Sequence, residues 1–256
     1  MVNNLFKRSY LHRNFARVRY DNLWNTKGVF TTIRIKGNPP KLIFVNKHIE
    51  NLNKSLKKIK IDFVLTDKKL NQIIMGHLKK NTKYDHLLRI AVNSKLISFS
   101  IRKKIKTNQF LRGILINYIR PKPTIKNLYY KKLLSISKAL NYKNEEGILF
   151  HKNNLLEGCT TNLIFTKKEK LYIPKNNYYF GITLKILLQY SQRKIIKTNI
   201  NINKLKNFDE ILLTGSGKGI VALSSISEIN WVKKSDKIYK EFQQAYKSCI
   251  KQINET

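Results

Sequence analysis

Two residues on separate segments could hold the two ends of one cofactor. Glu157 opens a glycine turn and begins the phrase EGCTTNLIF, which ends in an apolar run at Phe165. Lys126 lies upstream, just after a proline-rich connector. A partly desolvated amine can attack a carbonyl carbon, and a carboxylate can pair with a protonated ring nitrogen. The pair therefore indicates an enzyme that binds an aromatic nitrogen cofactor by an imine at one end and an ion pair at the other.

Two further stretches have the composition of anion sites. The first contains Gly181, Ile182 and Thr183, and the second contains Gly215 and Ser216. Each stretch places small or hydroxyl residues at a turn or helix start, where backbone N–H groups favour a phosphate. Helix caps and ordinary turns use the same residues, so either stretch alone is weak. Together with a lysine and a carboxylate, they predict a phosphorylated cofactor.

Composition excludes several classes of protein. The chain has 256 residues, 42% of them hydrophobic, which suffices for one large or two modest cores. It has no apolar run long enough to span a bilayer. Its two cysteines and five histidines lack metal-ligand spacing, so we expect no metal site, a reducing compartment and a cytoplasmic location.

The formal net charge of +36 raises the alternative of a basic nucleic-acid-binding protein. Lysine, asparagine and isoleucine, whose codons are rich in A and T, are all abundant, and lysine far outnumbers arginine. This pattern favours genome composition as the cause of the high net charge. The basic residues are then expected to form a lysine-coated surface, which could attract a small anionic substrate. The basic first twenty residues superficially resemble a transit peptide, but residues 16–21 continue into the folded pattern, so we expect no cleaved presequence.

Apolar spacing predicts an α+β first half. We expect strands at 29–35, 41–45, 87–92 and 96–101, and helices at 47–61 and 65–78. The two prolines at positions 121 and 123 predict a short extended connector. The predicted organisation is a small N-terminal α+β domain over 1–118, a linker over 119–123 and a larger domain over 124–256.

The second half is predicted to mix strands and helices. We expect a helix at 128–140, with Lys126 near its start, and strands at 147–150, 163–165, 171–173 and 210–214. A helix should run from Gly181 to Tyr190, and an amphipathic helix should cover 237–250.

Taken together and in order, these phrases resemble the fold-type IV pyridoxal-phosphate enzymes. This family includes branched-chain and D-amino-acid aminotransferases and 4-amino-4-deoxychorismate lyase. The resemblance also covers residues 28–34, which look like the N-terminal strand motif, and residues 48–52, which look like its helix. It implies pyridoxal 5'-phosphate as cofactor, a two-domain α+β and α/β fold, and a homodimer with active sites near the subunit interface.

The resemblance also implies roles for individual residues. Lys126 would bind the cofactor and act as the catalytic base, and Glu157 would keep the pyridine nitrogen protonated. The phosphate would be held by the two anion stretches, through Ile182, Thr183, Gly215 and Ser216. Thr31 would line the substrate side.

Within the family the chain is most similar to the lyase. It is short, and Thr31 stands where the aminotransferases usually have a glutamate. The lyase releases pyruvate from aminodeoxychorismate to give 4-aminobenzoate for folate synthesis, and an aminotransferase on the same fold remains the alternative. One departure affects the cofactor site: the family's helix usually has an arginine on the phosphate, and this chain has Asn51 there. Lys54, one turn on, is a point charge that does not reproduce a guanidinium.

Overall fold

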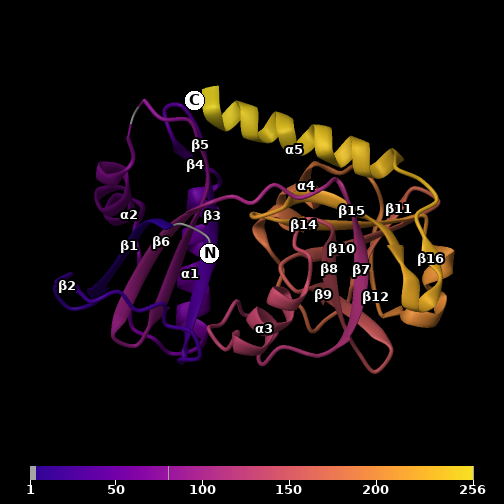
Figure 1. Cartoon of the computed structure of the whole chain (residues 1–256), viewed down its shortest axis with the longest axis horizontal. Coiled ribbons are helices and arrows are strands. Elements are labelled where there is room, and N and C mark those ends of the chain that lie inside the picture. Colours follow the sequence, from indigo (N-terminus) through magenta and orange to yellow (C-terminus); the bar gives the residue numbers. More distant parts are fainter. Residues whose placement is uncertain (1–3, 80, 256) are drawn as a thin grey trace. The chain divides into compact units, whose positions relative to one another are not determined.

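The computed structural model describes residues 4–79 and 81–255, and these divide into two compact units. The first unit holds the residues up to Lys104, then Ile125–Lys131 and the chain's end from Ile253. The second unit holds Ile105–Thr124 and Lys132–Gln252. Both units mix helices with a large sheet, which agrees with the expected α+β organisation (Figure 1).

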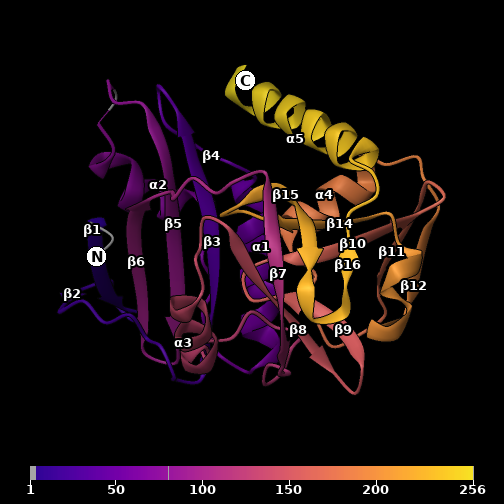
Figure 2. The same cartoon turned by 45° about the vertical axis from the view of Figure 1, so that its right-hand side comes forward.

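The first unit is built on a six-stranded sheet in the order β2-β1-β6-β5-β3-β4. Its strands are β1 (Asn4–Leu11), β2 (Arg17–Val18), β3 (Gly28–Gly37), β4 (Lys41–Leu42), β5 (Tyr84–Asn93) and β6 (Leu96–Lys103). Figure 2 shows β6, β5 and β3 side by side, and each pairs antiparallel with its neighbour.

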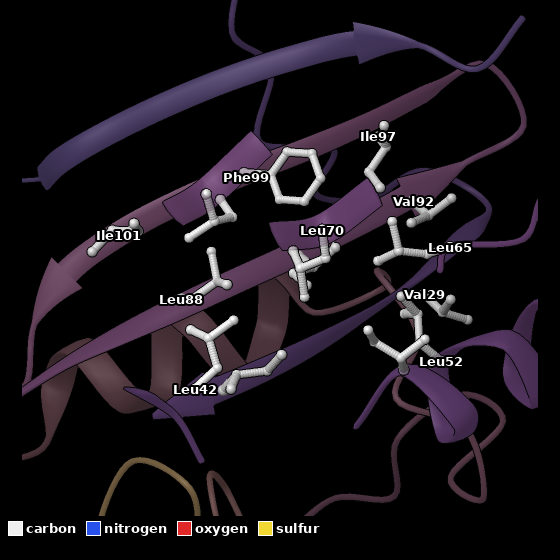
Figure 3. Close-up of a cluster of buried hydrophobic side chains, with 14 of the residues drawn as sticks. Val29, Leu42, Leu52, Leu65, Leu70, Leu88, Val92, Ile97, Phe99 and Ile101 are labelled. Atoms are coloured by element: carbon white, nitrogen blue, oxygen red, sulfur yellow. The ribbon is translucent and has the colours of Figure 1, made fainter. Parts of the chain in front are cut away.

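Two helices cover one face of this sheet and close its core. They are α1 (Val45–Lys58) and α2 (Asp67–Ile74), followed by the short helix η1 (Met75–His77). Figure 3 shows side chains of the strands and helices meeting in one apolar cluster, which includes Val29, Leu52, Leu70, Leu88 and Phe99. Burial of these side chains, at about 1.5 to 3 kcal/mol each, favours a single register for β3.

The second unit is built on a ten-stranded mixed sheet in the order β12-β11-β10-β14-β15-β7-β8-β9-β13, with β16 beside β15. Its strands are β7 (Phe110–Asn117), β8 (Glu145–His151), β9 (Asn154–Gly158), β10 (Asn162–Lys167), β11 (Lys170–Pro174), β12 (Ile195–Thr198), β13 (Ile200–Asn201), β14 (Glu210–Gly215), β15 (Gly219–Ile226) and β16 (Trp231–Val232). A buried apolar cluster around Phe165, Leu213 and Trp231 forms a core on this sheet.

The helices of the second unit are α3 (Lys131–Ala139), α4 (Ile182–Tyr190), the short η2 (Ile202–Asn207) and η3 (Ser227–Ile229), and α5 (Lys237–Glu255), whose last residues join the first unit. A buried carboxylate fixes the start of α5. Glu210 on β14 accepts the backbone N–H groups of Ile238 and Tyr239 at 2.9 and 2.8 Å. A negative group at a helix N-terminus is favourable because it meets unsatisfied N–H groups.

The division of the chain differs from the sequence-based boundaries of 1–118, 119–123 and 124–256. β7 lies between β15 and β8, so residues 105–118 belong to the second unit. Residues 125–131, by contrast, belong to the first unit. Apolar spacing does not reveal these boundaries because they depend on long-range strand pairing.

Several expected elements are confirmed and others were wrong. The strands at β3, β5, β6 and β8 and the helices α1, α4 and α5 occur where spacing predicted them. The strand expected at 41–45 ends at Leu42, and the helix expected at 128–140 begins only at Lys131. Strands β1, β7 and β15 were not predicted.

Two absences hold for the part of the chain that the structure describes. None of its helices is long and apolar enough to cross a membrane. Nor do three or more of its histidine, cysteine and acidic side chains come together in a group that could hold a metal ion.

Candidate active site

Lys126 lies on an irregular segment that is hydrogen-bonded to β3 in the first unit, and not at the start of a helix as expected. The backbone N–H of Phe30 donates to the carbonyl of Lys126 at 2.9 Å, and that of Leu128 donates to Gly28 at 3.0 Å. Asn127 forms an antiparallel bridge with Val29. This isolated bridge and its two flanking hydrogen bonds to β3 fix the lysine backbone. Its Nζ lies 5.1 Å from the centre of the Phe30 ring, a cation–π distance.

Thr31 and His48 form a buried hydrogen-bonded pair in the same unit. The Thr31 hydroxyl lies 2.8 Å from Nδ1 of His48, and the two residues are 3% and 5% exposed. Burial, with the charge of Lys126 as a second cause, lowers the pKa of His48 to about 3. His48 is therefore neutral at physiological pH, and its ring can orient the Thr31 hydroxyl without adding charge beside the lysine.

Arg89 is a second cation near the Phe30 ring. Its guanidinium carbon lies 5.3 Å from the centre of the Phe30 ring and 3.7 Å from that of Trp24. One nitrogen, Nη2, donates to the carbonyl of Asn22 at 2.8 Å. Its Nε is buried and has no hydrogen-bond partner among the described residues. Phe30 thus contacts two cations, Lys126 and Arg89.

Asn51 lies on α1, and its carbonyl accepts the hydroxyl of Ser55 at 2.7 Å. Lys54, the possible substitute for the missing arginine, forms an exposed ion pair with Glu50 on the same helix. The first unit therefore has no guanidinium at the position that the family resemblance assigns to the phosphate.

In the second unit, Glu157 is buried and paired. It lies near the end of β9 and is 5% exposed. The guanidinium of Arg120 holds both carboxylate oxygens, with Nε 2.6 Å from Oε1 and Nη2 3.0 Å from Oε2. The backbone N–H of Tyr179 also points to Oε2, at 3.3 Å. Such a bidentate pair keeps the carboxylate ionised and in one orientation.

Asn162, the first residue of β10, joins that strand to the start of α4. Its side-chain oxygen accepts the N–H of Gly181 at 3.0 Å, and its amide donates to the carbonyl of Tyr179. A Cβ at Gly181 would meet that oxygen at 2.6 Å, so only glycine fits this contact. Gly181 caps α4 without a side-chain hydrogen bond, and Ile182 and Thr183 follow it, both buried. The first N–H groups of this helix can therefore face an anion.

The second anion stretch lies near the start of α4, because Asn162, which contacts Gly181, pairs with Thr214 across β10 and β14. Thr214 is 1% exposed, and its Oγ1 has no hydrogen-bond partner among the described residues. A Cβ at Gly215 would lie 3.0 Å from the carbonyl of Thr160, so this turn packs directly on the glutamate turn. A buried hydroxyl that lacks a partner, next to a glycine turn and a helix start, fits a phosphate group.

The candidate residues fall into two groups. Lys126, Thr31 and Asn51 lie in the first unit, whereas Glu157, Ile182, Thr183, Gly215 and Ser216 lie in the second. Within the second unit a continuous chain of contacts links Glu157 through Tyr179 and Asn162 to both anion stretches.

Four residues near the candidate residues were not predicted from sequence: Arg120, Asn162, Arg89, and His48 as a partner of Thr31. For two of these residues, the sequence position gives an indication of importance. Asn162 belongs to the glutamate phrase itself, and Arg120 is the only arginine in the proline-rich connector. Arg89 and His48 had none, because their importance depends on neighbours far away in the chain.

Each unit carries residues that the family resemblance assigns to the cofactor, and comparison with known proteins identifies the family. The family model "amino-transferase class IV" matches residues 28–226. The chain therefore belongs to the aminotransferase class IV family, whose members use pyridoxal phosphate, so the predicted fold and cofactor are confirmed.

Individual relatives carry two different activities in their names. The chain is 22% identical to the aminodeoxychorismate lyase of Bacillus subtilis over 260 residues, which covers 88% of this chain and 86% of that protein. The solved branched-chain aminotransferase of Thermoproteus uzoniensis, with norvaline, has a TM-score of 0.78 at 18% identity, covering 94% of this chain and 93% of its own. That of Escherichia coli has a TM-score of 0.73 at 17% identity, covering 94% and 92%. These structural likenesses show the fold.

Proposed function

We propose that this protein is an aminodeoxychorismate lyase, which converts 4-amino-4-deoxychorismate to 4-aminobenzoate and pyruvate for folate synthesis. The observation that carries this proposal is Thr31, a buried hydroxyl bonded to His48 at the strand position where the family's aminotransferases usually have a glutamate. A neutral hydroxyl suits proton movement beside the lysine. The aminodeoxychorismate lyase of Bacillus subtilis among the relatives supports the same choice.

Lys126 is the proposed base. Its amine would hold the cofactor and, once free, would remove the proton from the amine-bearing carbon of the substrate. The C–O bond to the enolpyruvyl group breaks next, a proton on the leaving group gives pyruvate, and the substrate ring becomes aromatic. Thr31, oriented by His48, would hold a proton on the substrate side of this step.

Glu157 and Arg120 set the charge at the other end of the proposed site. When bound, pyridoxal phosphate supplies a ring that accepts electrons as the substrate's C–H bond breaks. This requires a protonated ring nitrogen, which an ionised Glu157 favours. The bidentate contact with Arg120 keeps that carboxylate charged despite its burial.

The phosphate is proposed to bind the N–H groups of Ile182 and Thr183 at the start of α4, together with Gly215 and Ser216. Hydroxyl groups of Thr183 and Thr214 would add hydrogen bonds. A helix N-terminus and a glycine turn provide several N–H donors, and this compensates in part for Asn51, which replaces a charged side chain. Asn51 is proposed to contact the phosphate only as a neutral donor.

The substrate is a dicarboxylate, and the proposed site offers it a cation. Arg89 keeps a buried Nε donor without a partner among the described residues, and its guanidinium contacts the same ring as Lys126. The chain's formal net charge of +36 would also raise the rate at which an anionic substrate arrives. By family resemblance the working form is proposed to be a homodimer.

The rival activity is amine transfer to a keto acid, which branched-chain aminotransferases of the same fold support. The test is to incubate the cofactor-loaded protein with aminodeoxychorismate and follow pyruvate and 4-aminobenzoate. A parallel sample receives branched-chain or D-amino acids with 2-oxoglutarate. Stoichiometric pyruvate and 4-aminobenzoate support the lyase, whereas glutamate formation without pyruvate rejects it.

A further inference from the structure

A second buried ion pair lies close to the Glu157 pair in the second unit. Lys218 follows the Gly215–Ser216 turn, and its Nζ lies 2.6 Å from Oε2 of Glu146 on β8. The two side chains are 1% and 3% exposed. The ammonium also donates to the carbonyl of Glu145 at 3.3 Å and lies 4.4 Å from the centre of the Tyr142 ring.

The same carboxylate is bonded to the turn that follows Glu157. Oε1 of Glu146 accepts the backbone N–H of Thr160 at 2.8 Å and the hydroxyls of Thr160 and Thr161 at 3.1 and 3.2 Å. A Cβ at Gly158 would come within 2.8 Å of that oxygen, so the turn is packed directly against it.

Glu146 therefore binds two turns at once. One is the turn between β9 and β10, which follows Glu157, and the other is the turn between β14 and β15, which contains Gly215 and Ser216. These turns also touch each other, because Gly215 packs on the carbonyl of Thr160.

We propose that Glu146 and Lys218 are positioning residues that set the phosphate-binding turn relative to the glutamate turn. This inference rests on the proposed phosphate role of Gly215 and Ser216, and it is independent of whether the reaction is elimination or amine transfer. Neither residue contacts the cofactor in this proposal. Their effect is to keep the N–H donors of the turn at the distance from Glu157 that a phosphorylated ring requires.

The arrangement explains why an ion pair is placed here. A buried lysine must be paired, and the two threonines with Lys218 provide four donors to one carboxylate, which fixes its orientation. The pair links segments about seventy residues apart in the chain. An apolar pair would fill the space but would not hold the Thr160 N–H.

The test compares binding of pyridoxal 5'-phosphate with binding of pyridoxal, which lacks the phosphate, to the cofactor-free full chain. Lys218→Met should weaken binding of pyridoxal 5'-phosphate by about ten- to a hundredfold, because a displaced turn loses its alignment. Binding of pyridoxal should change by less than about threefold, since the ring contacts of Glu157 remain. Absorbance titration gives both dissociation constants.

Folding must be separated from positioning, since Lys218→Met leaves Glu146 buried without its counter-ion. The double variant Lys218→Met with Glu146→Gln carries no uncompensated charge, and the neutral amide at position 146 is not expected to hold the β14–β15 turn. It should show near-native thermal unfolding and the same selective loss for the phosphorylated ligand. Lys237→Met, which removes an exposed ion pair with Glu169 in the same unit, is the matched control and should change neither constant.

Equal losses for the two ligands in both Lys218 variants would overturn the proposal, because the pair would then serve the fold alone. Unchanged binding of both ligands would overturn it as well. If the unmodified protein binds pyridoxal as tightly as pyridoxal 5'-phosphate, the proposed phosphate site itself is wrong. That result differs from a failure of the Glu146–Lys218 pair to position the turn.

Discussion

Arg120 and Glu157 form a two-pronged ion pair inside the second unit, with N···O distances of 2.6 and 3.0 Å and side chains 4% and 7% exposed. This ion pair favours the charged form of the Glu157 carboxylate, which is proposed to bind the cofactor. Desolvation alone would favour its neutral form, which cannot pair with a protonated pyridine. The guanidinium offsets that desolvation, so the carboxylate stays charged where water is excluded.

The first prediction follows from this pair. Arg120→Met should lower the free energy of unfolding by about 3 to 5 kcal/mol, because it leaves a buried carboxylate uncompensated. Arg120→Met combined with Glu157→Gln should recover part of that loss. Arg193→Met, which removes more exposed contacts with Glu241 and Glu169 in the same unit, should cost less than Arg120→Met. Urea unfolding measures all three, and an equal effect of Arg120 and Arg193 would contradict the prediction.

The second prediction concerns Lys126. Lys126→Ala should lower turnover by about 10³-fold or more, and the purified protein should lose the visible absorbance of covalently attached cofactor. Lys131→Ala, at an exposed lysine five residues on, is the control and should retain both. Borohydride treatment followed by peptide mass spectrometry identifies the attachment point. A yellow, active Lys126→Ala protein would exclude the assignment.

The third prediction concerns the Thr31 hydroxyl. Thr31→Val removes a buried hydrogen bond to Nδ1 of His48 and should cost about 1 to 3 kcal/mol of stability. Turnover should fall as well, while the affinity for pyridoxal 5'-phosphate should stay close to that of the parent. Thr31→Ser keeps the hydroxyl and should retain most of the rate. If the valine and serine variants give the same rate, the hydroxyl has no part in the reaction.

The fourth prediction concerns pH. His48 has a pKa near 6.5 when unfolded and about 3 in the folded protein, so above about pH 6.5 both states are neutral. As the pH falls below that value, the unfolded chain takes up a proton that the folded chain does not. Stability should therefore drop, by about 2 kcal/mol between pH 6.5 and pH 5 from this group.

The variant His48→Asn tests this pH dependence. Urea unfolding midpoints measured at several pH values should depend less on pH between 6.5 and 5 in this variant than in the parent protein. Burial also lowers the pKa of His12 and His86, so a smaller slope of the same sign should remain. An unchanged slope in His48→Asn would show that another group is responsible.

The fifth prediction uses the buried hydroxyl of Thr214, which has no partner among the described residues. Thr214→Val should leave the stability of the cofactor-free protein within about 0.5 kcal/mol, because no hydrogen bond is lost. Thr166→Val is the matched control on the neighbouring strand. Its hydroxyl accepts the N–H of Glu210 at 3.1 Å, so its loss should cost about 1 to 3 kcal/mol. Equal costs would mean that Thr214 has a bonding partner.

The sequence was sufficient to predict the fold type, the cofactor and most local elements, because the family motifs occur in order and α1 and β3 follow simple apolar periods. It could not predict that the segment carrying Lys126 is bonded to β3, since backbone pairing with residues almost a hundred positions away leaves no local pattern. For the same reason it missed Arg120 beside Glu157 and Lys218 beside Glu146. A buried ion pair depends on which distant strands become neighbours, and single-chain periodicity carries no information on that.

The segment that carries Lys126 belongs to the first unit although residues of the second unit precede and follow it. On the ribosome, the amino-terminal unit therefore cannot complete its sheet edge until the residues between Lys104 and Lys131, β7 among them, have emerged. Neither unit can be obtained whole by a single cut in the gene. A gene fusion or a split-protein reporter would have to respect this interleaving, and cutting between β6 and β7 would separate Lys126 from the sheet to which its segment is bonded.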